Sequence, residues 1–418
     1  MIYIYLKISI LSTLLFCVAS CTEPYALQTN TFEDAIVVEA TITNEFKKQE
    51  IKLSRTYRLE DNGPEFEAGA TVYVKDDLGN QYNFEENNGK YRSISEFQAV
   101  ANRNYQLYIT TNDGKSYSSS NEKLTTDTPI QDLVPEVTTK DGVRGVQISV
   151  NSFDPSNTSK YYRYEYEETY KVIAPRWVNT KAVLTSLPPG SNMPGEITLE
   201  PRTTEARICF STKKSDNIIL TKTNDLSEDR VNFPIRFISS SNYIIMHRYS
   251  ILVKQYVQNL AAYTFYQTLK EISSSESILT QSQPGYFSGN VKSTTNPNEK
   301  VIGFFDVSTF SEKRLFFNFS DVLPNDPLPS YPYNCPVNIA ADQRNQYFFQ
   351  YCVAAPPTNC KGQLIFILLS MGQSIYYGGY PQYGVIPSNG SITIQIYPIQ
   401  CGDCTSFSNN IRPSFWID

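Results

Sequence analysis

The cysteines are the residues of this sequence with the most possible chemical roles. Two of the eight lie near the N-terminus, and the others lie in the second half of the chain, at Cys209, Cys335, Cys352, Cys360, Cys401 and Cys404. Cys401 and Cys404 have C-x-x-C spacing, which occurs in thioredoxin-like redox sites and in half of many zinc sites. Here the pair follows a predicted strand in a polar tail, and no second pair has similar spacing. We therefore predict structural disulfides, with redox and zinc sites as the alternatives, and neither a metal nor a cofactor.

Other catalytic constellations are weak in this sequence. The only histidine, His247, would have to serve any Ser-His-Asp or Cys-His mechanism, and no Gly-x-Ser-x-Gly elbow supplies a serine. Glu165, Glu167 and Glu168 could provide the carboxylate pair of a glycosidase, but 42 acidic residues make chance pairs common. We predict a structural or surface histidine and no catalytic residue. The segment Asp76–Asn80 lacks the register of a calcium loop and is predicted to form a hairpin turn.

One aromatic loop is the best candidate for binding. It contains Tyr376, Tyr377, Tyr380 and Tyr383 among glycine and proline. Tyrosine offers a rigid amphipathic surface, so exposed rings in such a loop can stack on sugars or contact partner proteins. The alternative is a tyrosine-rich turn that packs against its own sandwich.

The N-terminal residues indicate the compartment. A single Lys7 precedes an apolar run from Ile8 to Val18, and two small residues then lead to Cys21. This order is typical of a secretory signal, and the cysteine makes the site one for lipoprotein cleavage. A spanning helix needs about 20 apolar residues, so the run is too short for an uncleaved anchor. We predict that Cys21 carries the lipid that attaches the protein to the membrane.

Export also favours disulfides among the remaining cysteines. Their spacing does not choose one pattern of pairing, although local pairs of Cys352 with Cys360 and of Cys401 with Cys404 fit it. Because all six cysteines lie in the second half, the N-terminal half must be held together by packing alone.

The composition favours a mainly β fold. The chain has 30 Tyr and 23 Phe, which suit pleated surfaces. About seven short alternating segments separated by turns predict an immunoglobulin-like β-sandwich over 35–125. The polar, proline-containing segment Thr125–Pro135 is the predicted domain boundary, and a larger β-rich domain with disulfides and one packed helix is predicted over 136–418. A signal peptide over 1–20 and a tether over 21–34 precede them.

Three segments of the second domain have readable patterns. Tyr162, Tyr164, Tyr166 and Tyr170 all stand at even positions and predict a strand with one aromatic face that packs in the core. Asn259–Ser273 has apolar residues at helical spacing, and Asn259 could cap that helix. Two separate strands are predicted over Val301–Val307 and Lys313–Phe319.

Several short segments, taken in order, resemble the DUF4249 family of Bacteroidota lipoproteins over nearly the whole mature chain. They are Cys21–Tyr25, Asp154-Pro155, Tyr161–Tyr164, Gln255-Tyr256, Gly289–Val291, Asn296-Pro297, Val301–Phe305, Cys401–Cys404 and Pro413–Trp416. The resemblance implies an outer-membrane lipoprotein, often encoded beside a TonB-dependent receptor. The biochemistry of the family is uncharacterised.

The expected function is therefore accessory and non-enzymatic. The protein would be anchored in the outer membrane by its N-terminal lipid and would capture ligand for a TonB-dependent receptor, on the periplasmic or the surface face. A membrane-tethered glycan or peptide hydrolase and a structural or adhesion module of the envelope are the alternatives. With a net charge of −6 and no basic face, the chain is not expected to bind nucleic acid.

Overall fold

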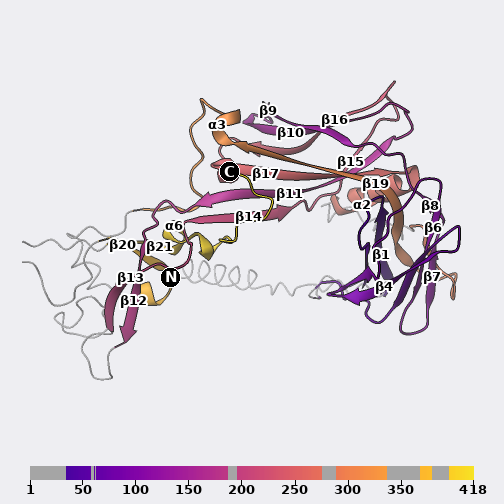
Figure 1. Cartoon of the computed structure of the whole chain (residues 1–418), viewed down its shortest axis with the longest axis horizontal. Helices are drawn as coiled ribbons and strands as arrows, with labels where there is room; N and C mark the ends of the chain where they lie inside the picture. The colour runs from indigo at the N-terminus through magenta and orange to yellow at the C-terminus, as the bar shows by residue number, and fades with distance from the viewer. Residues whose placement is uncertain are drawn as a thin grey trace, which may run out of the picture.

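The computed structural model describes residues 34–57, 61, 63–186, 195–274, 289–336, 368–378 and 395–418. These residues form a mainly β protein with one helix packed on its sheets, which confirms the predicted fold class. Two sandwiches lie side by side and share one long strand (Figure 1). Within the described ranges, no helix has the length and apolar character needed to cross a bilayer.

The N-terminal sandwich is built from short antiparallel strands that enclose one core. Its strands are β1 (Ile36–Thr43), β2 (Glu50–Arg55), β3 (Thr71–Asp76), β4 (Gln81–Asn87), β5 (Lys90–Ser93), β6 (Asn104–Thr110), β7 (Ser116–Ser119) and β8 (Glu122–Lys123). Alternate side chains point inward, as Tyr105, Leu107 and Ile109 do in β6. This period-two burial is the pattern that predicts a half-buried strand.

Two later strands complete the N-terminal sandwich. The strand β18 (Val291–Ser293) pairs with β7, and the first part of β19 (Val301–Asn318) runs parallel to β1. Val291, Val301 and Phe305 lie in the same core as the N-terminal strands. The sequence pattern assigns all residues from 136 onward to the second domain. In the structure, the N-terminal core also contains residues from that later part of the chain.

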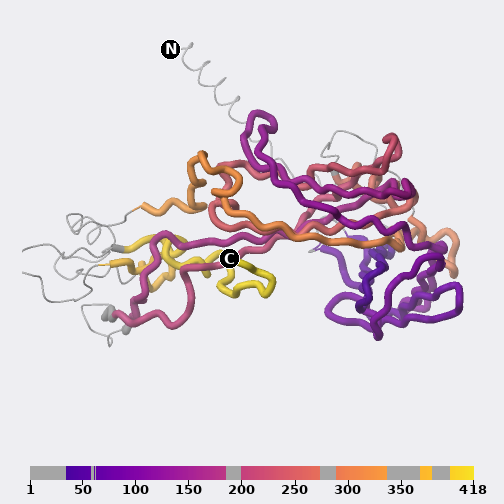
Figure 2. Tube along the Cα trace, turned by 45° about the horizontal axis from the view of Figure 1, so that its top comes forward, coloured from indigo at the N-terminus to yellow at the C-terminus, as the bar shows by residue number. Residues whose placement is uncertain are grey.

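The strand β19 is continuous, so the prediction of two strands over 301–307 and 313–319 is wrong. The polar residues between them stay extended because β17 (Arg248–Gln258) pairs with them, Val257 opposite Thr309 and Gln255 opposite Ser311. A strand partner satisfies their backbone groups, which the local sequence does not reveal. Figure 2 shows β19 passing from the second sandwich to the indigo N-terminal one.

The second sandwich packs a three-stranded sheet on the other half of the large sheet. The smaller sheet has the order β16 (Asp229–Ser239), β10 (Val143–Asp154) and β9 (Ile130–Lys140). The larger one contributes β14 (Ile208–Lys214), β15 (Ile219–Lys222), β11 (Tyr161–Ile173), β17 and the rest of β19. The predicted tyrosine face of β11 lies in this core, where the Tyr162 and Tyr164 hydroxyls donate hydrogen bonds to Asp229 and Gln255.

The predicted boundary at Thr125–Pro135 is only partly a linker. The strand β9 begins at Ile130 and includes Pro135. Among the described strands, β9 pairs only with β10 and lies at an edge, where a sheet tolerates proline.

The helix α2 (Leu260–Ser274) confirms the predicted helix. The Asn259 side chain accepts a hydrogen bond of 2.8 Å from the Ala262 backbone and caps the helix, as predicted. Ala262 is buried and the Phe265 ring contacts Phe304 of β19, so the apolar stripe packs on the sheet.

The remaining elements are short and lie mostly toward the C-terminus. They are the hairpin β12 (Thr180–Ser186) and β13 (Gly195–Pro201), the pair β20 (Ser374–Gly378) and β21 (Gln395–Pro398), the helices α3 (Phe319–Val322) and α6 (Ile399–Gly402), and the 3-10 turns η1 (Tyr243–Ile245) and η4 (Cys404–Ser406).

Asp154 closes the end of β10 with a dense set of hydrogen bonds. Burial alone would raise the pKa of its carboxyl group, but donors on Ser156, Thr158 and Ser159 hold the pKa well below its ordinary value. A depressed folded-state pKa gives stability that is present above the unfolded pKa of about 3.9 and is lost as the pH falls toward the folded value.

We expect Asp154→Asn to lower the free energy of unfolding at pH 7 by about 1–3 kcal/mol, since a buried charge-assisted acceptor is lost. Urea unfolding should show the difference from wild type shrinking as the pH falls from about 5 to about 2. The exposed Asp132→Asn is the control, with little effect at either pH. If the difference in unfolding free energy between wild type and Asp154→Asn did not change with pH, the lowered pKa of Asp154 would be contradicted.

Candidate functional site

An open cleft lies where the two sandwiches meet. It has a volume of about 830 Å³ and is bordered by β1, β2, the start of β19 and the helix α2. The helix contributes Phe265, Tyr266 and Leu269 to its apolar wall. Lysines of the neighbouring strands, among them Lys52 and Lys90, line its rim. We call this space the junction cleft.

Arg163 of β11 occupies the base of the junction cleft. Its guanidinium lies 4.1 Å from the centre of the Tyr256 ring and 4.7 Å from that of Tyr266, and it is ion-paired with Glu165. Although burial opposes the charge, Tyr266 and Glu165 raise the pKa of Arg163 above its ordinary value. Such a stacked cation is worth about 2 kcal/mol when desolvated. The arrangement therefore fixes both tyrosine rings at the cleft.

Close backbone packing holds the cleft wall together. Gly303 of β19 has a φ of +133°, and a Cβ there would lie 2.1 Å from the Val38 carbonyl oxygen of β1. The Asn290 side chain accepts a hydrogen bond from the Phe305 backbone N–H and donates to its carbonyl oxygen, at 2.7 and 2.9 Å. Arg163, Tyr256, Asn290 and Gly303 all belong to segments that carry the family resemblance.

The carboxylates of the junction cleft are neutralised by neighbouring cations. Glu39 pairs with Lys52 at 2.9 Å, and Glu50 pairs with Lys90 at 2.8 Å. The hydrogen bond from Lys90 lowers the pKa of Glu50. A general acid needs the opposite shift, so this chemistry favours binding over glycoside hydrolysis.

The three glutamates considered as a catalytic pair do not converge. Glu165 lies at the junction cleft, whereas Glu168 is buried on the other face of β11. There it accepts hydrogen bonds from Arg236 at 3.0 Å and from the Tyr249 hydroxyl at 2.8 Å. Glu167 lies between them on β11, beside Lys214 of β14.

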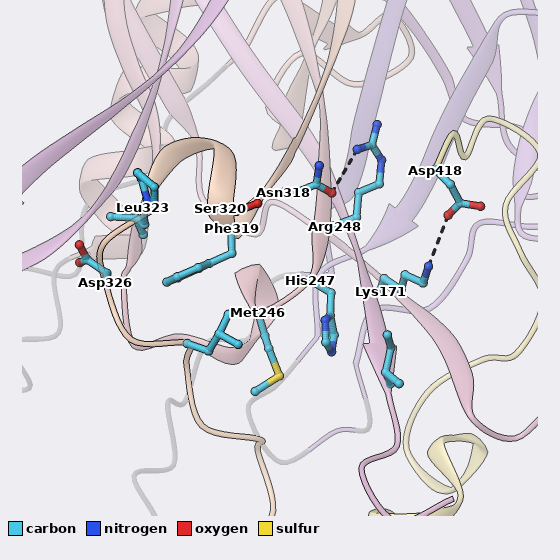
Figure 3. Close-up of a pocket in the computed structure, with 13 residues that line it drawn as sticks. Lys171, Met246, His247, Arg248, Asn318, Phe319, Ser320, Leu323, Asp326 and Asp418 are labelled. Carbon is cyan, nitrogen blue, oxygen red and sulfur yellow. Dashed lines mark hydrogen bonds and ion pairs between the residues drawn. The ribbon is translucent and has the colours of Figure 1, made fainter.

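His247 lines a separate pocket of about 580 Å³ at the other end of the second sandwich (Figure 3). Burial and the nearby Lys171 lower the pKa of its imidazole, which favours the neutral ring. A catalytic triad requires a carboxylate that accepts a hydrogen bond from the imidazole, and none does so among the residues that the structure describes. The polar contacts in the pocket instead join Arg248 to Asn318 and Lys171 to Asp418.

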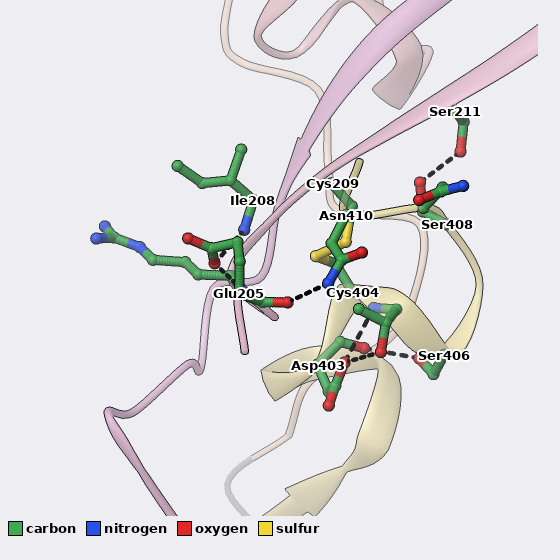
Figure 4. Close-up of a disulfide and its surroundings, with 12 residues drawn as sticks. Glu205, Ile208, Cys209, Ser211, Asp403, Cys404, Ser406, Ser408 and Asn410 are labelled. Atoms are coloured by element: carbon green, nitrogen blue, oxygen red, sulfur yellow. Dashed lines mark hydrogen bonds between the residues drawn. A yellow bond between two sulfur atoms is a disulfide. The ribbon is translucent and has the colours of Figure 1, made fainter. Parts of the chain in front are cut away.

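The disulfides connect distant segments, and Cys401 and Cys404, a local pair that the spacing allowed, do not pair with each other. Cys209 pairs with Cys404, and Cys335 pairs with Cys401. The short helix α6 ends between the two cysteines, and each is held against different neighbours. The Cys404 N–H donates to the Ala206 carbonyl oxygen and the Cys401 carbonyl oxygen accepts from the Arg176 N–H. Figure 4 shows the Cys209–Cys404 bridge beside Asp403, whose carboxylate caps η4.

The tyrosine loop and the remaining predicted site residues are only partly described. Tyr376 and Tyr377 belong to β20, where Tyr376 is buried and the Tyr377 ring packs edge-on to Tyr397 at 5.0 Å. This part of the loop packs against its own fold, which is the alternative weighed from the sequence. Lying outside the described residues are Cys21, Cys352, Cys360, Tyr380 and Tyr383.

The predicted hairpin turn at Asp76–Asn80 is confirmed. The Asp76 carboxylate accepts hydrogen bonds from the backbone N–H groups of Leu78 and Asn80 and pairs with Arg103 at 3.0 Å. Gly79 provides the positive φ that the turn requires. The carboxylate is thus bonded to the turn and to Arg103.

The sequence did not single out Arg163 as a site residue. A signal was present, because an arginine inside the aromatic strand Tyr161–Tyr164 must be paired if that strand is buried. The rings that sandwich it come from β17 and α2, about 90 or more residues away, and local spacing cannot reveal them.

A family model described as a domain of unknown function, DUF4249, matches residues 22–314. The chain belongs to the DUF4249 family. Every residue named at the junction cleft lies within this DUF4249 match, whereas Cys335, Cys401 and Cys404 lie beyond its end.

Comparison with other proteins adds little to the family assignment. No curated protein matches the chain. Among solved structures, the chain is similar to one named "Biofilm associated protein - BSP domain", with 7% identity, coverage of 87% of this chain and 76% of that one, and a TM-score of 0.17. A similarity of this size carries no functional argument.

Proposed function

We propose that this protein is a non-enzymatic outer-membrane lipoprotein that is anchored through Cys21 and captures ligand for a TonB-dependent receptor. The junction cleft is the observation that carries the proposal. It combines an apolar aromatic wall with a charged rim, and its carboxylates are ion-paired. These features suit recognition by surface complementarity rather than bond breaking.

The sequence supports the location and the partner. The signal and Cys21 favour a lipid-anchored protein, and stable anchoring needs two or more acyl chains. The DUF4249 resemblance supports association with a TonB-dependent receptor.

Co-purification tests this function. The full chain, tagged at its C-terminus and extracted from host membranes in detergent, is expected to bring down a TonB-dependent receptor in a near-stoichiometric amount. Recovery of the chain without a receptor would favour the structural or adhesion alternative. Turnover of a glycan or peptide by the purified protein would favour the hydrolase.

Charge reversal at the cleft rim links the association to the junction cleft. We expect Lys52→Glu combined with Lys90→Glu to reduce receptor recovery several-fold, because rim charges steer association. Each single reversal, Lys52→Glu or Lys90→Glu, is compared with Lys181→Glu on β12, which reverses a similarly exposed lysine away from the cleft. Equal losses of receptor recovery at the rim and at Lys181 would show that the junction cleft does not contact the receptor.

A further inference from the structure

A third cavity lies beside the Cys209–Cys404 disulfide, apart from the junction cleft and the His247 pocket. It has a volume of about 730 Å³ and is bordered by β14, η1 and the C-terminal segment after η4. We call it the aromatic pocket, because five rings line it, those of Tyr170, Phe210, Tyr243, Tyr333 and Phe407.

Four of the rings form two edge-to-face pairs. Tyr333 and Phe407 meet edge to face at 4.8 Å on one side, and Tyr170 and Tyr243 meet edge to face at 5.7 Å on the other. Tyr333 is 38% exposed, so part of its surface remains accessible to a ligand. Rings in fixed orientations offer flat apolar surfaces at little entropic cost.

Polar groups lie between these rings. The Tyr170 and Tyr243 hydroxyls are 3.2 Å apart, and the Ser211 hydroxyl lies 2.6 Å from that of Ser408. Thr212 and Asn409 add a further hydroxyl and an amide to the lining. Lys213 is the one charged residue in the lining, and no carboxylate is present there among the described residues.

A disulfide and two backbone hydrogen bonds hold two sides of the pocket together. The disulfide ties Cys209, next to Phe210, to Cys404, three residues before Phe407. Phe210 and Asn409 exchange backbone hydrogen bonds of 2.7 and 3.2 Å across the same gap. Preorganisation of this kind raises affinity because less freedom is lost on binding.

We propose that the aromatic pocket binds a neutral sugar ring of an oligosaccharide. The apolar C–H face of the sugar packs on the tyrosine and phenylalanine rings, and its hydroxyls exchange hydrogen bonds with the tyrosine, serine and asparagine side chains. The tyrosine and serine hydroxyls hydrogen-bond in pairs, and each oxygen keeps a lone pair that a sugar hydroxyl can use and a wholly apolar ligand cannot. An anion would find a single cation among the described lining residues. The inference goes beyond receptor association and does not depend on it.

The test uses the full chain in a detergent without a sugar headgroup. The probes are linear neutral hexasaccharides of glucose, mannose, galactose and N-acetylglucosamine, with a neutral hexapeptide as the comparison, and binding is measured by titration calorimetry. We expect at least one hexasaccharide to bind with a millimolar or lower dissociation constant and the peptide not to bind. Binding of the peptide alone, or of no probe at millimolar concentration, overturns the proposal.

Variants place the binding in the pocket. We expect Phe407→Ala and Tyr333→Ala each to weaken sugar binding at least tenfold and Tyr333→Phe to retain most of it. Phe46→Ala, which removes an exposed ring of the β1–β2 loop, is the control and should bind like wild type. Unchanged binding in both pocket variants assigns the sugar elsewhere and overturns the proposal.

A second measurement needs no substitution. Saturating hexasaccharide is expected to slow acetylation of Lys213 in the wild-type chain several-fold, while Lys181 on the β12 hairpin reacts at its usual rate. Sugar binding without protection of Lys213 would also place the site outside the aromatic pocket.

Discussion

Replacing Gly303 by alanine is expected to destabilise the protein by about 3–5 kcal/mol, which is at the upper end of single substitutions. The φ of +133° is strained for any residue with a side chain. In addition, the new Cβ would lie 2.1 Å from the carbonyl oxygen and 2.7 Å from the nitrogen of Val38. Backbone atoms of a paired strand cannot move aside, so the contact between β1 and β19 must open.

Urea unfolding measures this loss, with Gly114→Ala as the matched control. Gly114 also has a positive φ, but a Cβ added there would meet no other atom within 4 Å. Its replacement should therefore cost only about 1 kcal/mol from backbone strain. Similar losses in both variants would show that strain, and not the close approach to Val38, dominates at Gly303.

Removal of the Cys209–Cys404 disulfide has the second largest expected effect. We expect Cys209→Ala combined with Cys404→Ala to lower the free energy of unfolding by about 2–5 kcal/mol. The bridge joins residues 195 apart, so it restricts a long stretch of the unfolded chain. Tryptophan fluorescence measures this unfolding, since the buried Trp416 packs on Phe210 beside the bridge.

The other disulfide provides the comparison. Cys335 and Cys401 are 66 residues apart, so in the chain-entropy account their removal costs about 1 kcal/mol less. Sugar binding at the aromatic pocket should fall with loss of the first bridge, because that bridge joins the segments that carry Phe210 and Phe407. The reverse order of stabilities would contradict the chain-entropy account.

Local patterns predicted the elements whose burial has a simple period. The strand β6 is one of the short alternating segments that the sequence predicts, and α2 begins at the residue after its predicted cap, Asn259. Period and capping report which face is buried and where an element begins. They do not report what the buried face contacts.

The partners of these elements could not be predicted for the same reason. The pairing of β1 with β19 joins Ile36 to Val301, and the disulfides join segments that share no local signal. The junction cleft depends on this pairing, because β1 and β19 form one of its walls. The aromatic and charged residues of the cleft can therefore be read from the sequence, but the contacts between them cannot.

The parallel arrangement of β1 and β19 has a mechanical consequence. A pull on the end of the chain ahead of Ile36 acts along β1, between β2 on one side and β19 on the other. Every registered pair from Ile36↔Val301 to Thr43↔Ser308 then bears load simultaneously in shear, instead of opening one after another as in an unzipped hairpin. A membrane tether attached at this end would thus transmit tension to the body while the N-terminal strand stays in place.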